Sequence, residues 1–165
     1  MIQIREFEQS EKDIEFLTDM LYESIHMPDN KPSKHELLNS PTIKKYSEGW
    51  GKLGDRALIA VNDDNIPVGA AWYRLFNENQ KGYGYVDDKT PELSIALSCE
   101  ARGKGVGTLL MKKLLEAASK DGYPSLSLSV DPNNSEAVQL YKKLGFIQCG
   151  SSGTSWTMIY HIYSK

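Results

Sequence analysis

Six residues near the middle of the chain carry the clearest chemical signal. The segment 102–107 reads RGKGVG, with three glycines and two cations just where a helical pattern begins. A helix start offers backbone N–H groups without partners and a partial positive charge, and a turn free of side-chain bulk lets an anion reach them. The segment therefore predicts a seat for a phosphate or diphosphate, to which the Thr108 hydroxyl could add a donor. A tight turn with two solvated cations is the alternative interpretation.

Two well-known phosphate-binding loops fit this segment poorly. A Walker loop needs four residues between its first glycine and a Gly-Lys-Ser/Thr ending, and the chain has no such string. A dinucleotide fingerprint is a closer rival, because strand, glycines, helix, strand and Asp131 follow in that order. Its spacing is G-x-G-x-x-G, whereas the residue three positions after Gly105 is Thr108. The spacing therefore disfavours a dinucleotide site.

Regular elements must flank this turn to hold it in place. Residues 92–98 alternate apolar and polar side chains, which predicts a half-buried strand with its Leu and Ile side chains on one face. From Val106 onward apolar residues, Leu109 among them, recur three and four apart, which predicts a helix that ends at Gly122. Residues 125–130 alternate again, so we expect a parallel strand pair joined by a right-handed crossover.

The other expected elements lie on both sides of this unit. The first half is expected to hold a strand at 2–7, a helix from Ser10 to before Pro28, a weaker helical stretch at 33–50 interrupted by Pro41, and a hairpin of strands 57–61 and 66–76. The first helix has an expected core stripe of Ile14, Leu17, Met20, Leu21, Ser24 and Ile25. The end of the chain is expected to hold a helix from Asn134 to Gly145 and strands at 146–149 and 156–162.

A long polar segment, residues 77–90, separates the hairpin from the central strand. Loops of this length are often functional. We interpret this segment first as an ordinary solvated loop. The alternative is that Tyr83, Tyr85, Asp87 and Asp88 line a pocket for a cationic acceptor.

Two motifs together resemble a known family. Arg102-x-x-Gly105-x-Gly107 after a short strand is similar to the acyl-CoA signature of the GNAT superfamily of N-acetyltransferases, Gln/Arg-x-x-Gly-x-Gly/Ala. Further along, residues 134–137 (NSEA) and 140–146 (LYKKLGF) resemble the family's Asn-x-x-Ala and Leu-Tyr-x-x-x-Gly-Phe runs. The resemblance covers residues 91 to 147 closely and the rest in outline.

The resemblance implies a fold and an activity. The expected fold is a single mixed α/β domain over residues 1–165, with a central, mostly antiparallel sheet, one splayed parallel strand pair and about four flanking helices. The expected activity is direct transfer of the acetyl group of acetyl-CoA to a primary amine in a ternary complex.

The resemblance also implies site residues. The diphosphate of acetyl-CoA would lie on the glycine turn, and its pantetheine arm along the backbone at the end of the central strand. Asn134 would contact that arm, although it is equally suited to cap the following helix. The implied coenzyme contacts are Ile95, Leu97, Arg102, Gly103, Lys104, Gly105, Val106, Gly107, Thr108 and Asn134. One departure from the family is that residues 98–101 read SCEA, where relatives often have Pro and an aromatic.

Proton transfer needs two further groups. An alkyl amine with a pKa of about 10.4 is mostly charged at neutral pH and must lose a proton, whereas a departing thiolate gains from an acid. Tyr141 occupies the family's position for that acid, with aromatic packing as the alternative. Glu92 is the candidate base, although its spacing to the turn looks shifted by one residue; an ordinary exposed acid is the alternative. Three lone histidines are weaker candidates: His26, His35 and His161.

Composition limits the remaining possibilities. Nineteen Lys and Arg against 22 Asp and Glu give a net charge of −3, which argues against a nucleic-acid partner. The sequence shows no membrane span and no signal-peptide pattern, so we expect a cytoplasmic protein without a membrane partner. Cys99 and Cys149 have no metal-ligand spacing, so we expect reduced thiols and no metal site.

Two alternatives to an enzyme stay open at this point. A non-catalytic acyl-CoA sensor or regulatory module would keep the pocket without the chemistry, and a plain interaction domain would use the glycine turn only structurally. For an enzyme, net acidity and the aspartates near residue 87 favour a small cationic amine slightly over a protein N-terminus or lysine. The sequence leaves the oligomeric state open, a homodimer included.

Overall fold

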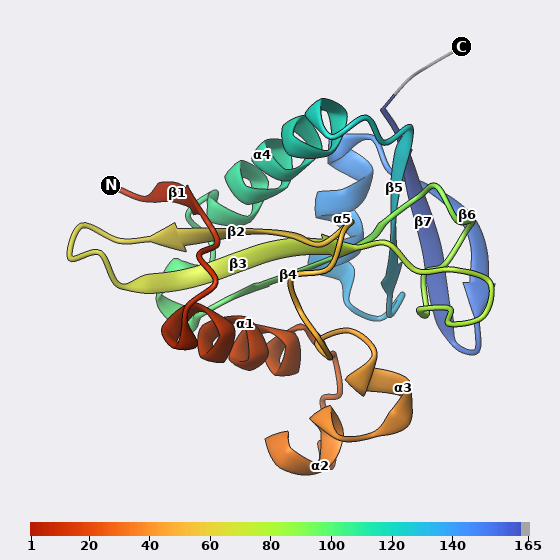
Figure 1. Cartoon of the computed structure of the whole chain (residues 1–165), viewed down its shortest axis with the longest axis horizontal. Helices are drawn as coiled ribbons and strands as arrows, with labels where there is room; N and C mark the ends of the chain where they lie inside the picture. The colour runs from red at the N-terminus through yellow and green to blue at the C-terminus, as the bar shows by residue number, and fades with distance from the viewer. Residues whose placement is uncertain (163–165) are drawn as a thin grey trace.

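A seven-stranded sheet forms the centre of the computed structural model, which describes residues 1–162. The strand order is β1-β2-β3-β4-β5-β7-β6, and all neighbours are antiparallel except β4 and β5 (Figure 1). This arrangement confirms the mixed α/β fold with one parallel pair. The strands are β1 Gln3–Glu6, β2 Arg56–Val61, β3 Pro67–Arg74, β4 Glu92–Leu97, β5 Ser125–Val130, β6 Ile147–Ser152 and β7 Ser155–His161.

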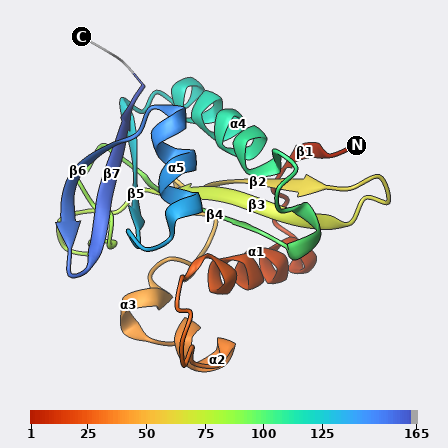
Figure 2. The same ribbon diagram turned by 180° about the vertical axis from the view of Figure 1, so that it is seen from behind.

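Five α-helices within the described residues flank this sheet, where about four were expected. They are α1 Glu11–Ser24, α2 Lys34–Leu38, α3 Pro41–Lys44, α4 Val106–Lys120 and α5 Ser135–Leu144. The helices α4 and α5 pack on one face, and α1 covers the other, with α2 and α3 beyond it (Figures 1 and 2). Within residues 1–162, no helix has both the length and the apolar character that crossing a membrane requires.

The central strand β4 contributes to both cores, as its alternation predicts. Leu93, Ile95 and Leu97 belong to the cluster beneath α4 and α5. Ala96 belongs to the cluster beneath α1. Side chains on the intervening positions, Glu92 included, therefore face the α1 layer.

The parallel strands β4 and β5 are paired only where they begin. Glu92 is in register with Ser127, and the Ser127 N–H donates to the Pro91 carbonyl at 2.9 Å. Beyond this point the two strands diverge (Figure 1). The sheet is therefore open between β4 and β5 at the end of β4 that leads to the glycine turn.

The prediction of a core-facing side chain is wrong at two helix positions, Ile14 and Leu109. Ile14 is 39% exposed, because Asp13 turns inward instead and receives both terminal guanidinium nitrogens of Arg5 at 2.8 Å. This pairing holds the pKa of Asp13 below its usual value and allows a carboxylate to be buried. On α4, Leu109 is likewise exposed.

The segment 33–50 forms two short helices in place of one weak one. Helix α2 ends at Leu38, and Pro41 is the first residue of α3. Proline suits a helix start because its missing N–H has no intrahelical partner there. The predicted interruption at Pro41 is therefore confirmed, with the proline beginning a new helix.

Candidate active site

A cavity of about 790 Å³ lies where β4 and β5 diverge. Both strands contribute to its wall, through Ile95 and Leu97 on one side and Val130 on the other. The end of α1, the residues that follow it, α3 and α5 complete the lining. The cavity is therefore formed by segments from most of the chain.

The glycine turn offers a run of free backbone donors at the start of α4. Within residues 1–162, no hydrogen bond engages the N–H groups of residues 103–108, and the first helical bond runs from Leu109 N–H to the Gly105 carbonyl at 3.1 Å. Gly103 and Gly105 have φ of 74° and 79°, a left-handed conformation that glycine adopts without strain. Six consecutive backbone N–H groups therefore have no hydrogen-bond partner among the described residues.

The remaining predicted coenzyme contacts lie around this turn. Arg102 and Gly107 line the cavity, and the Arg102 Nε donates to the Leu97 carbonyl at 3.3 Å. Asn134 caps α5 by accepting from the Ala137 N–H at 3.4 Å, and it also lines the cavity. Both interpretations of Asn134 are therefore compatible with its position.

Tyr141 places a free phenol in the cavity. The residue is 8% exposed on α5, and its ring packs against Phe146 at 5.9 Å between centroids. No residue in the described part of the chain hydrogen-bonds its hydroxyl. Burial raises the pKa of Tyr141 to about 12, because the phenolate is poorly solvated there. The phenol is therefore protonated at neutral pH and free to donate.

Glu92 lines the same cavity and is buried, so the alternative of an exposed acid is wrong. Its Oε2 accepts from the Tyr46 hydroxyl at 2.7 Å, and its Oε1 from the Gly84 N–H at 3.0 Å. Burial raises the pKa of Glu92 to about 7, although both hydrogen bonds and the charge of Lys45 oppose the rise. A carboxyl with this pKa can exchange a proton at neutral pH.

Tyr46 is a site residue that the sequence analysis missed. Its hydroxyl donates to Glu92 and accepts from the Tyr83 N–H at 2.7 Å. Burial and the neighbouring carboxylate raise the pKa of Tyr46, so it acts as a permanent donor. Tyr46 follows a short helix in a weakly patterned stretch, and no local signal distinguishes it from a packing tyrosine.

The long polar loop contributes less than was considered. Tyr83 lines the cavity and stacks on Tyr46, with 6.5 Å between ring centroids. Asp88 instead accepts from the Tyr85 hydroxyl, and Asp87 from the Lys89 N–H at 2.8 Å. Both aspartates are exposed and neither is among the residues that line the cavity, so the solvated-loop interpretation fits them and the alternative of an acceptor pocket does not. Of the three histidines, His26 alone is among the lining residues.

The burial of Glu92 predicts an unusual pH dependence of stability. Because its folded-state pKa of about 7 exceeds the ordinary 4.5, the folded protein binds this proton more tightly than the unfolded chain. The contribution of this group is fully present below pH 4.5 and is lost as the pH rises through 7. We expect Glu92→Gln to raise the free energy of unfolding at pH 8 by up to about 3 kcal/mol relative to its effect at pH 4.

Thermal unfolding at pH 4 and pH 8 measures this difference. Each kcal/mol corresponds to about 2–4 °C in Tm for a chain of this size. Glu116→Gln is the control, because Glu116 is exposed on α4 and has only a distant partner in Lys113, at 3.9 Å. A Glu92→Gln variant destabilised equally at both pH values would contradict the assignment.

Fold and site together define a class of protein. An opened parallel pair, a turn of free amides and a cavity with one titratable carboxyl and one free phenol suit the binding of a long anionic ligand beside acid–base groups. The family model described as "Acetyltransferase (GNAT) family" matches residues 15–146. The chain therefore belongs to the GNAT acetyltransferases, a family of enzymes.

Known proteins of this family resemble the chain in sequence and in fold. "Putative phosphinothricin acetyltransferase YwnH" of Bacillus subtilis is 34% identical over 101 residues, which span 61% of this chain and 59% of that protein. The chain thus covers less than two thirds of this relative. A phosphinothricin acetyltransferase structure from Sinorhizobium meliloti in complex with AcCoA superposes with a TM-score of 0.66 at 20% identity, covering 97% of this chain and 88% of that one. A spermidine N-acetyltransferase chimera of Vibrio cholerae SpeG and hSSAT gives 0.66 at 18% identity, covering 98% and 95%.

Proposed function

We propose that the protein is an acetyl-CoA-dependent N-acetyltransferase that transfers the acetyl group directly to a primary amine. One observation carries the proposal. Glu92, from the α1 side of the sheet, and Tyr141, from the α5 side, line a single cavity beside the free amides of the glycine turn. This arrangement supports a base, an acid and an anion site that act together.

The turn and the opened sheet fit acetyl-CoA. A diphosphate is suited to the six free amides of residues 103–108 and to the positive charge of Arg102 and Lys104. The diverging strands leave room beside Ile95 and Leu97 for an extended arm. We assign the coenzyme contacts to these residues, with Thr108 in the first helical turn and Asn134 across the cavity.

The chemistry requires two proton transfers. Acetyl-CoA supplies an acyl thioester, whose C–S bond breaks as a C–N bond forms to the acceptor. Glu92 accepts a proton from the amine, directly or through a water, and Tyr141 donates a proton to the departing sulfur. Of the two protons that an ammonium nitrogen loses on becoming an amide, one ends on sulfur and the other reaches solvent. Tyr141 and Glu92 return to their initial states by exchange with water.

The acceptor is proposed to be a small primary amine that is cationic in solution. Glu23 and Glu92 both line the cavity, and carboxylates of this kind attract an ammonium group. Relatives and structural neighbours bear the names of spermidine, phosphinothricin and L-2,4-diaminobutyric acid acetyltransferases. These names support an amine of low molecular weight as the first class to test.

A screen of acceptors with acetyl-CoA tests the proposal. Polyamines, amino acids, aminoglycosides and peptides are offered in turn, with release of free thiol as the readout. Product with an amine supports the proposal. Tight binding of acetyl-CoA without product from any amine would favour a sensor module, and the absence of binding heat would favour an interaction domain.

The turn itself gives a separate prediction on binding. Gly105→Ala forces a side chain into the left-handed region, at a cost of about 1–2 kcal/mol, or relaxes the turn away from its binding geometry. We expect the Kd for acetyl-CoA, measured by calorimetry, to rise about ten-fold. Gly122→Ala is the matched control, because its φ is 88° and it lies beyond the far end of α4. Equal Kd values for both variants and wild type would argue against a coenzyme site at this turn.

A further inference from the structure

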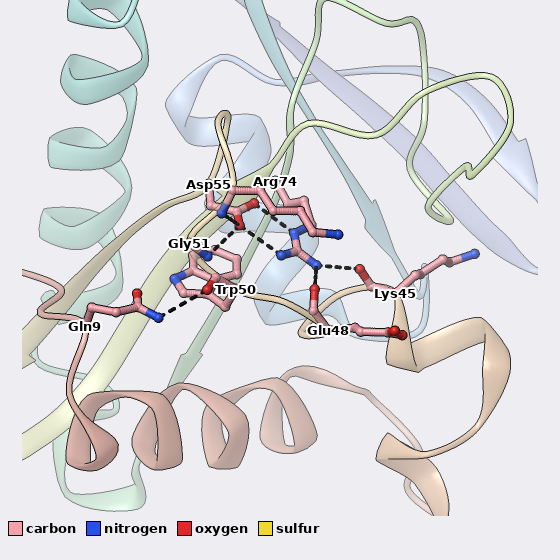
Figure 3. A network of polar contacts seen from close by, with 8 residues as sticks. Gln9, Lys45, Glu48, Trp50, Gly51, Asp55 and Arg74 are labelled. Atoms are coloured by element: carbon pink, nitrogen blue, oxygen red, sulfur yellow. Dashed lines mark hydrogen bonds and ion pairs between the residues drawn. The ribbon is translucent and has the colours of Figure 1, made fainter.

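A buried ion pair lies on the strand next to Glu92. Arg74, the last residue of β3, donates from Nε and Nη2 to the two carboxylate oxygens of Asp55, each at 2.8 Å. The two side chains are 6% and 3% exposed. Figure 3 shows the paired groups side by side. A two-pronged pair of this kind has a fixed geometry, because both groups are planar.

The pair also anchors the backbone that follows α3. The Nη1 of Arg74 donates to the carbonyls of Lys45 and Glu48, both at 2.8 Å (Figure 3). Asp55 in turn accepts from the N–H groups of Gly51 and Lys52, both at 2.9 Å. The segment 45–55 is therefore held at both of its ends by one ion pair.

Tyr46 sits directly beside one anchored carbonyl, between the two that Arg74 holds. Its side chain reaches Glu92, with 2.7 Å between its hydroxyl and Oε2. A rigid backbone on both sides limits where this hydroxyl can lie. The ion pair therefore holds the backbone on both sides of the residue that donates to Glu92.

The strand register makes this arrangement notable in another way. Arg74 and Glu92 are direct cross-strand partners in the β3–β4 pair, and opposite side chains in such pairs have Cβ atoms about 4.5–5.5 Å apart. Arg74 nevertheless pairs with Asp55, and no ion pair within residues 1–162 engages Glu92. Glu92 thus accepts a hydrogen bond from the neutral Tyr46 hydroxyl, although the Arg74 guanidinium belongs to its direct cross-strand partner.

We propose that Arg74 and Asp55 are positioning residues for the transfer reaction, which hold the Tyr46 hydroxyl on the Glu92 carboxylate. This inference rests on the proposed function for its link to catalysis. The anchored hydroxyl fixes the direction of the carboxylate in the cavity, and it sets the balance between the charged and neutral forms of Glu92.

Several groups face Glu92 and share in that balance. Tyr46 and Lys45 approach from the segment after α3, Tyr83 and the Gly84 N–H from the long loop, and Arg74 from β3. The other titratable side chains that line the same cavity are Glu23, His26, Lys31, Arg102, Asp131, Glu136 and Tyr141. Among them, the Tyr46 hydrogen bond is the largest influence that lowers the pKa of Glu92.

Charge-conserving variants separate positioning from electrostatics. Arg74→Lys keeps the positive charge, but an ammonium lacks the planar guanidinium that bonds Asp55 and two carbonyls at once. Asp55→Glu keeps the negative charge but makes the side chain one methylene longer. Any change at Glu92 then arises from lost anchoring. Arg56→Lys is the matched control. Arg56, on β2, also forms ion pairs, but with Glu6 and Asp121 and not with a group that contacts Tyr46 or Glu92.

The readout is the titration of the Glu92 carboxyl by carbon-13 NMR, on protein labelled at the side-chain carboxyl of glutamate. The Glu92 signal is assigned by its loss in Glu92→Gln. We expect Tyr46→Phe to raise the pKa by about one pH unit, because a donor to the charged form is lost. Arg74→Lys and Asp55→Glu should each also raise the pKa of Glu92. In a protein that already carries Tyr46→Phe, Arg74→Lys should cause no further rise in this pKa.

Kinetics give the second readout. With a pKa one unit above 7, the ionised fraction of Glu92 at pH 7 falls from about half to about one tenth. Arg74→Lys should therefore lower kcat at pH 7 about five-fold and leave the KM for acetyl-CoA unchanged. At high pH, the kcat of the variant should return to the wild-type value. Arg56→Lys should match wild type in both readouts.

Two results would overturn the inference. One is an Arg74→Lys or Asp55→Glu protein, folded by circular dichroism, whose Glu92 titrates as in wild type. The other is a shift from Arg74→Lys that adds in full to that of Tyr46→Phe. Full activity of Glu92→Gln would instead remove Glu92 from the proposed function, which the NMR titration does not measure.

Discussion

Replacing Tyr141 by Phe is expected to lower kcat by about 100-fold or more while the Kd for acetyl-CoA stays unchanged. The phenol has no hydrogen-bond partner within residues 1–162 and lines the cavity, so its loss removes a donor without breaking a structural contact. With a pKa of about 12, it is protonated across the whole neutral range. Without it, the sulfur departs as an unassisted thiolate.

Stopped-flow or steady-state thiol release gives kcat, and calorimetry gives the Kd. Tyr160→Phe is the matched control, because Tyr160 packs against the same Phe146 ring, at 5.4 Å between centroids, and is not among the residues that line the cavity. A Tyr141→Phe protein that turns over a genuine acceptor at the wild-type rate would show that the acid lies elsewhere.

The second large effect is expected at Glu92. Glu92→Gln removes a group that is half ionised near pH 7 and should lower kcat/KM for the amine by about 100-fold at that pH. The acidic limb of the wild-type pH profile should have a midpoint near 7, since activity needs the ionised form. In the variant this limb should disappear.

The control for this variant is again Glu116→Gln, on the exposed face of α4. The stability of the Glu92→Gln protein makes the result easier to interpret. Its Tm relative to wild type should be higher at pH 8 than at pH 4, and circular dichroism at pH 8 checks that the inactive variant is folded. An unchanged profile in Glu92→Gln would leave the amine to be deprotonated by another group in the cavity.

The contacts of Tyr46 and Arg74 explain how the fold tolerates a buried carboxyl at Glu92. A buried carboxylate without a partner is costly, whereas two hydrogen bonds from Tyr46 and Gly84 satisfy the charged form in part. They do so without an ion pair, which would hold the pKa well below neutrality. The cavity thus keeps a carboxyl that titrates near neutral pH, and we expect the fold to lose some stability at high pH as a result.

The glycine turn could be predicted from sequence because its determinants are local. Left-handed backbone at residues 103 and 105 favours glycine, and the first turn of any helix leaves backbone N–H groups without intrahelical partners. The same holds for β4, α4 and β5, whose periodicities of two and about 3.6 residues record which faces are buried. The two motifs near residues 102 and 141 then sufficed to indicate the family.

The sequence by itself thus determined most of the order of elements, the glycine turn at the start of α4 and the candidates Tyr141 and Glu92. Only the tertiary structure decided that Glu92 is buried and bonded to Tyr46, a residue 46 positions away. It also decided that Asp55 pairs with Arg74, and that Asp87 and Asp88 are not among the residues that line the cavity. Hydrogen bonds between distant segments depend on how layers pack, and residue spacing along one strand or helix carries no information about them.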